Sequence, residues 1–152
     1  MINQIGNYSL FIALFASIFL IFQSSNVIRN KSKNLDGKIF SVLSVQSLMV
    51  LISFFSLIYA FIVSDFSNET VYNNSHTTKP LFYKISGSWG NHEGSLLLWL
   101  LVLTIFLFIF FISSKKLLNK YRILTVLFQE LIIIGFLLFI FFTSNPFLHL
   151  FP

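Results

Sequence analysis

Cysteine is absent from the 152 residues of this chain. Its absence excludes disulfides, thiolate metal sites, CxxC redox chemistry and cysteine nucleophiles. Charged residues are also scarce, at 10% of the chain, whereas a soluble domain has about 25%. The first eight residues contain no Lys or Arg, so we expect no cleavable secretory signal or mitochondrial transit peptide.

Hydrophobic residues make up 56% of the chain and include 21 Phe, and the mean hydropathy is +0.84. Four apolar runs are each long enough to cross a bilayer, because about 20 residues at 1.5 Å rise span its ~30 Å hydrocarbon core. They lie at about 7–23, 40–63, 95–113 and 123–142. The sequence therefore predicts an all-α polytopic membrane protein, with residues 1–152 forming one membrane domain and an outer loop at 64–94.

The formal net charge of +5 does not indicate nucleic-acid binding, because the basic residues cluster in short loops between the apolar runs, where they set orientation in lipid. The first and third loops carry most of them: Arg29, Lys31, Lys33, Lys38, Lys115, Lys116, Lys120 and Arg122. The positive-inside rule predicts that these loops face the cytoplasm-like side. Both termini and the 64–94 loop are then expected on the outer side, the periplasm or the intermembrane space.

Polar residues gather at 83–95, directly before the third apolar run, and polar groups kept at a membrane are candidates for function. The candidate site residues are Trp89, Gly90, His92, Glu93, Gly94, Ser95 and Trp99. Asn91 is a candidate N-cap for the third helix, which would place Glu93 in its first turn, where the helix dipole favours negative charge.

Each of these residues has a structural alternative. Trp89 and Trp99 could belong to an aromatic belt at the membrane surface. His92 could ligate haem iron or a metal, or could simply be a capping or hydrogen-bonded residue. Glu93 could handle protons or act as a capping charge. The glycines match neither GxGxxG nor a Walker loop, and neither an HExxH motif nor a Ser-His-Asp set is present.

Glu130 lies within the fourth apolar run, where a charge is costly. We expect it to face a partner helix or to lie near Lys120 or Arg122. A buried carboxylate also leaves open an alternative function, as a proton- or ion-handling subunit of a transporter or respiratory complex. His149, near the end of the chain, is expected to be solvated or at headgroup level.

Residues 89–99 read W-G-N-H-E-G-S-L-L-L-W. This run resembles the W-G-x-H-E-G-S-x-L-L-W signature of the CcmF family, the haem lyase component of cytochrome c maturation. Further resemblances cover nearly the whole chain, at 6–8, 60–61, 65–67, 71–75, 81–85 and the T-S-N-P-F of 143–147.

The resemblance implies that haem is the cofactor of the full assembly. CcmF-like proteins take haem from a chaperone at the outer face and help attach its vinyl groups to the C-x-x-C-H thiols of apocytochrome c. They also carry a transmembrane haem b. The resemblance thus implies a haem chaperone, apocytochrome c and membrane lipid as partners, with no nucleic acid.

This chain resembles only the family's N-terminal part. The family's Trp-rich segment and four haem-ligand histidines have no counterpart here, and none of His76, His92 or His149 matches such a ligand. We therefore expect no catalytic residue and no metal ligand in this chain, and a haem-proximal or docking role for the segment 89–99. The chain is expected to be a split-gene product or a truncated sequence. Other polypeptides would supply the Trp-rich segment.

The residues Phe, Ile, Leu, Asn and Lys are abundant, as happens when codons are rich in A and T. This usage favours a mitochondrial gene and the mitochondrial inner membrane, with the bacterial inner membrane as the alternative.

Overall fold

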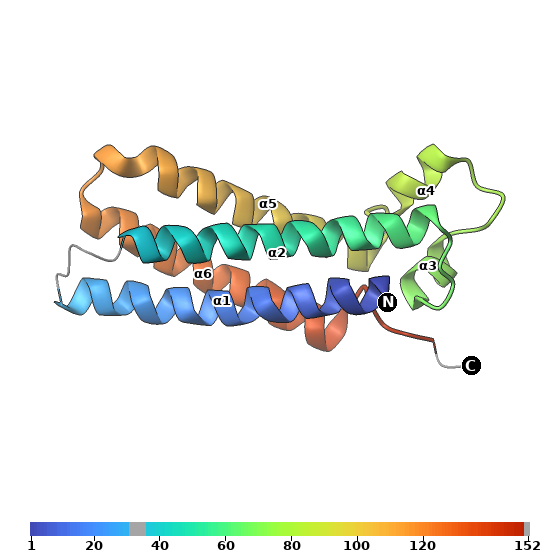
Figure 1. The fold of residues 1–152 in the computed structure, drawn as a ribbon, viewed down its shortest axis with the longest axis horizontal. Helices are drawn as coiled ribbons and strands as arrows, with labels where there is room; N and C mark the ends of the chain where they lie inside the picture. The colour runs from blue at the N-terminus through green and yellow to red at the C-terminus, as the bar shows by residue number, and fades with distance from the viewer. Residues whose placement is uncertain (31–35, 151–152) are drawn as a thin grey trace.

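Four long helices run side by side in the computed structural model, which describes residues 1–30 and 36–150 (Figure 1). They are α1 (Ile2–Asn30), α2 (Asp36–Ile62), α5 (His92–Ser113) and α6 (Asn119–Thr143). Each is long and apolar enough to cross a membrane. The predicted all-α polytopic fold with four membrane-spanning helices is confirmed. Lys31 and Lys33, which the sequence places in the first loop, lie outside the described residues.

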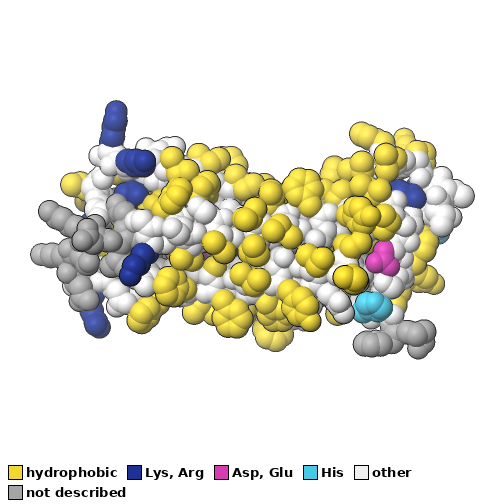
Figure 2. All heavy atoms as spheres, in the orientation of Figure 1, with side chains coloured by type: hydrophobic (Ala, Val, Ile, Leu, Met, Phe, Trp, Pro, Cys, Tyr) yellow, Lys and Arg dark blue, Asp and Glu magenta, His cyan; other side chains and the backbone are white. Residues whose placement is uncertain are grey.

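The helices pack in a ring in which α1 contacts α2 and α6, while α5 contacts α2 and α6. The inward faces bury aliphatic side chains, among them Leu10, Leu43, Leu57, Leu100 and Leu137. Phenylalanines cover the outward faces, as in Phe15, Phe55, Phe106, Phe128 and Phe142. Figure 2 shows hydrophobic side chains along the length of the bundle. A surface of this kind is matched to lipid rather than to water.

Two short helices, α3 (Glu69–Asn74) and α4 (Leu81–Gly87), lie within the segment 64–94 that hydropathy alone leaves as a loop. The turn that leads to them begins at Ser64, which has a positive φ of 54°. The Ser64 N–H donates to Phe61 O, and the Asp65 N–H donates to Ala60 O. This is the paired hydrogen-bond pattern of a Schellman motif. The Lys84 ammonium of α4 then donates to Ser64 Oγ at 2.7 Å.

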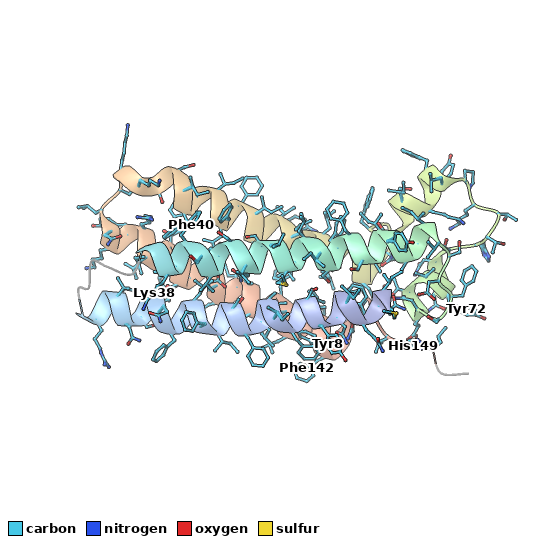
Figure 3. All side chains as sticks on the ribbon, viewed as in Figure 1. Tyr8, Lys38, Phe40, Tyr72, Phe142 and His149 are labelled. Atoms are coloured by element: carbon cyan, nitrogen blue, oxygen red, sulfur yellow. The ribbon has the colours of Figure 1, made fainter. Side chains whose placement is uncertain are left out.

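Lys and Arg side chains gather at one end of the bundle (Figure 2). This is the end where α1 and α5 finish and where α2 and α6 begin. At the other end, Figure 3 shows Tyr72 of α3 and His149 beside the N-terminal part of α1. A 3-10 turn, η2 (Ser114–Lys116), links α5 to α6 at the basic end. There the buried Arg122 guanidinium lies 3.9 Å from the centre of the Phe111 ring, a cation–π geometry.

Glu130 is fully buried inside the bundle, together with Gln46 and Ser17. The Gln46 amide donates to Glu130 Oε2 at 2.9 Å and to Ser17 Oγ at 2.6 Å, which joins α6, α2 and α1. The expectation of a partner helix for Glu130 is confirmed, and the partner is an amide on α2. The alternative function as a proton- or ion-handling subunit would need a second carboxylate beside Glu130, whereas its hydrogen-bond partner here is Gln46.

The Gln46 amide is expected to hold these three helices in register. Gln46→Leu keeps a similar volume but leaves Glu130 and Ser17 without its N–H groups. An unsatisfied buried polar group costs about 1–3 kcal/mol, and a charged one costs more. We expect Gln46→Leu to lower the free energy of unfolding by at least that amount, measured by denaturation in detergent.

The control is Gln23→Leu, at a half-buried position of α1. Combining Gln46→Leu with Glu130→Leu should restore most of the lost stability, since replacing both partners by apolar groups can be nearly neutral. Equal losses for Gln46→Leu and Gln23→Leu would contradict this role.

Candidate functional site at the start of helix α5

The turn at 88–91 joins α4 to α5, and Asn91 organises it. The Asn91 Oδ1 accepts from the Gly94 N–H at 2.7 Å, and its Nδ2 donates to Gly87 O at 2.8 Å. One side chain therefore satisfies a free donor at the start of α5 and a free acceptor at the end of α4. The predicted N-cap at Asn91 is confirmed, as is the position of Glu93 in the first turn of α5.

Gly94 is buried where α5 passes the backbone of this turn. A Cβ at position 94 would overlap the carbonyl oxygen of Ser88, a backbone atom that cannot rotate away as a side chain could. Ser88 is itself fully buried, and its hydroxyl donates to Ile85 O at 2.7 Å. The glycine is therefore required by the close approach of two backbones.

His92 connects the start of α5 to the end of α6. Its Nδ1 lies 3.1 Å from Ser144 Oγ, and its ring meets the Phe139 ring edge-on at 6.3 Å between centroids. The residue is exposed, whereas Ser144 is buried. The contact of Nδ1 with Ser144 and the contact of the ring with Phe139 therefore orient the imidazole.

Glu93 lines a polar pocket of about 170 Å³ between α3, α5 and the end of α6. The other lining residues are Glu69, Thr70, Asn73, Thr143, Ser144, Asn145 and Leu148. The two carboxylates, together with amide and hydroxyl groups, allow this pocket to accept hydrogen bonds and to attract positively charged groups. Among the described residues, no group of three or more His, Asp or Glu is placed to hold a metal ion.

The remaining candidates do not line this pocket. The Trp89 ring lies 6.4 Å from that of Phe54 on α2, and Trp99 is 61% exposed on the lipid-facing side of α5. Gly90 is in the exposed turn, and the Ser95 hydroxyl donates to His92 O within the helix. The structure places His92 against the end of α6, Glu93 in the pocket beside α3, and the Trp89 ring against α2.

The C-terminal segment 144–150 completes this end of the bundle, and sequence reasoning gave it no such role. Asn68, fully buried, donates to Asn3 Oδ1 at 3.0 Å and to Pro146 O at 2.9 Å. The Glu69 N–H also donates to Leu148 O. Gly6 faces the Phe147 ring so closely that a Cβ would overlap it. The sequence indicated this packing only in that residues 6–8 and 143–147 both resemble the same family.

The fold and this site define a polytopic helical membrane protein with an ordered polar cap at one end. The chain matches no family model. It is 39% identical over 152 residues to the cytochrome c-type biogenesis protein CycK of Rhizobium meliloti, covering 100% of this chain and 22% of the relative. It is 37% identical to the cytochrome c-type biogenesis protein CcmF of Haemophilus influenzae, covering 100% of this chain and 24% of that protein.

A solved structure described as cytochrome c haem lyase CcmF shares the fold, with a TM-score of 0.87 and 24% identity. The match covers 97% of this chain and 25% of the solved chain. The chain belongs to the CcmF family of cytochrome c-type biogenesis proteins, and it spans under a quarter of the length of the curated relatives named above.

The three histidines lie on different parts of the described structure. His76 is exposed between α3 and α4, His92 is turned toward Ser144 and Phe139, and His149 follows Leu148 in the C-terminal segment. The apolar groove between α5 and α6 and the one between α1 and α2 are lined by no histidine.

Gly94→Ala is expected to lower the stability of the chain by several kcal/mol, because the added Cβ forces two backbones apart. Gly135→Ala is the matched control. A Cβ there meets nothing within 4 Å, and Ala in a helix is favoured over Gly by up to about 1 kcal/mol. Thermal unfolding in detergent measures both, and two variants of equal stability would contradict the close approach at Gly94.

Proposed function

We propose that this chain is a membrane component of the cytochrome c maturation haem lyase, which assists covalent attachment of haem to apocytochrome c at the outer membrane face. The observation that carries this proposal is the 39% identity to CycK along the entire chain. The ordered cap at the start of α5 supports it, because the signature residue Gly94 is required by the close approach of two backbones and its N–H is capped by Asn91.

The orientation we propose puts the basic end of the bundle inside. Arg29, Lys38, Lys115, Lys116 and Lys120 belong to that end, and the positive-inside rule supports this orientation. Both termini, α3, α4 and the start of α5 would then face the periplasm or the intermembrane space, where haem is attached. We propose the mitochondrial inner membrane as the location, because the abundant Phe, Ile, Leu, Asn and Lys are residues that A/T-rich codons encode, and a bacterial inner membrane as the alternative.

The segment from Trp89 to Trp99 serves in this proposal as a docking element near haem and not as its ligand. His92 is held against α6 through Ser144, and Gly94 serves the close packing of the turn. Haem would be bound by the full assembly, whose other parts carry the Trp-rich segment and the haem-ligand histidines. The haem chaperone and apocytochrome c would be partners of that assembly.

A chimera tests the proposal. In a Rhizobium meliloti strain that lacks CycK, this chain replaces the 22% of CycK that it matches. We expect c-type cytochromes to mature, detected by haem staining after denaturing electrophoresis. The control chimera carries Gly94→Val, which disrupts the cap. If the chimera with the wild-type chain is inserted and stable but yields no holocytochrome, the proposal fails.

His92→Ala in the same chimera tests the docking role of the motif. We expect maturation to fall by at least tenfold, because the imidazole is the exposed polar group of the cap. We also expect the haem b absorbance of the purified chimera to be unchanged, since His92 is not a ligand. His76→Ala, at an exposed position, is the control. Loss of haem would show ligation instead, and unchanged maturation would remove the direct role of His92.

A further inference from the structure

Gly135 differs from the tightly placed glycines of this protein because it has free space around it. Gly6 lies against the Phe147 ring, and Gly94 lies against the Ser88 carbonyl. Gly135 is within α6, exposed, and a Cβ built there meets nothing within 4 Å. Glycine inside a helix costs about 1 kcal/mol relative to alanine, and in membrane helices it lets another helix approach closely. The close approach that Gly135 permits is made by no described residue.

Gly135 lies in an apolar groove between α5 and α6. The groove measures about 390 Å³ and is lined by Leu96 of α5 and by Ile132, Gly135, Phe136 and Phe139 of α6. The four α6 residues are spaced i, i+3, i+4 and i+7, so they form one face of the helix. Larger side chains border the glycine and leave a notch into which a side chain of another helix fits.

The outer end of this groove is the signature segment. Phe139 lines the groove and also contacts the His92 ring edge-on. A second groove, lined by Ile2, Ile5, Ile52, Phe55, Ser56 and Tyr59 between α1 and α2, contains no glycine. The α5–α6 groove therefore combines an apolar floor, a glycine notch and a polar group at the outer end.

We propose that a transmembrane helix from the remaining part of the CcmF-family protein lies in the α5–α6 groove and places a large apolar side chain over Gly135. This proposal rests on the proposed function. The chain corresponds to only 22–24% of CycK and CcmF relatives, so the family protein contains further chain that is available to pack against these four helices. A lipid chain or a second copy of this chain is the competing occupant.

Co-purification tests the proposal. The tagged chain is co-expressed with the part of Rhizobium meliloti CycK that it does not match. Gly135→Leu adds four carbons to the groove, and Val45→Phe adds four carbons at an exposed position of α2. We expect Gly135→Leu to reduce the bound CycK part by at least tenfold and Val45→Phe to leave it unchanged. Both variants should keep the unfolding temperature of the parent, because each position faces open space.

The outcomes separate this proposal from the proposed function. If Gly135→Leu binds the CycK part as well as the parent does, the groove is not the docking face, whether or not the chimera matures cytochrome c. If binding is lost as expected but the chimera matures no cytochrome, docking stands and the proposed function fails. The chain can also be purified without the CycK part and its oligomeric state measured. If Gly135→Leu changes that oligomeric state, a second copy occupies the groove and the proposal is overturned.

Photo-crosslinking gives an independent result, and the absence of cysteine allows single labels. Ile132→Cys and Val45→Cys each carry a benzophenone maleimide. We expect an adduct with the CycK part from position 132 and not from 45. A label at 132 that reacts with lipid alone would overturn the proposal, as would the absence of any co-purified CycK part with the parent chain.

Discussion

The hydrocarbon core of a membrane offers no hydrogen bonds to the backbone, and the structure of this protein follows from that constraint. The four long helices satisfy their own backbone groups along the span. Their first N–H and last C=O groups remain to be satisfied at the ends. Side chains and backbone turns meet part of this demand. Asn91 caps α5, Asn68 caps α3, and the Schellman turn at Ser64 closes α2.

The two ends of the bundle meet this demand differently. The basic end is built of short connections with Lys and Arg side chains. The opposite end is a layer in which α3, α4, the start of α5 and the segment 144–150 bond to one another. Asn68 contacts Asn3 and Pro146, so it joins three parts of the chain that are far apart in sequence. This order gives that end of the bundle a fixed shape.

The sequence predicts features that depend on local chemistry. Hydropathy identified the four spans, the residue types before the third span identified Asn91 as its cap, and the cost of a buried charge predicted a helix partner for Glu130. The sequence does not predict features that depend on the packing of distant segments. The pairing of His92 with Ser144 joins residues 52 positions apart. The short helices α3 and α4 are too brief to show a periodic pattern, and Gly94 could not be matched to Ser88 without coordinates.

The polar pocket beside Glu93 has an electrostatic consequence. Glu69 and Glu93 are both half-buried, and they line one small pocket with Thr70 and Asn73. Counterions screen exposed charges beyond about 8 Å at physiological ionic strength, but they screen partly buried charges much less. The negative field of this pocket will therefore persist in salt, and it will attract positively charged groups more strongly than anions.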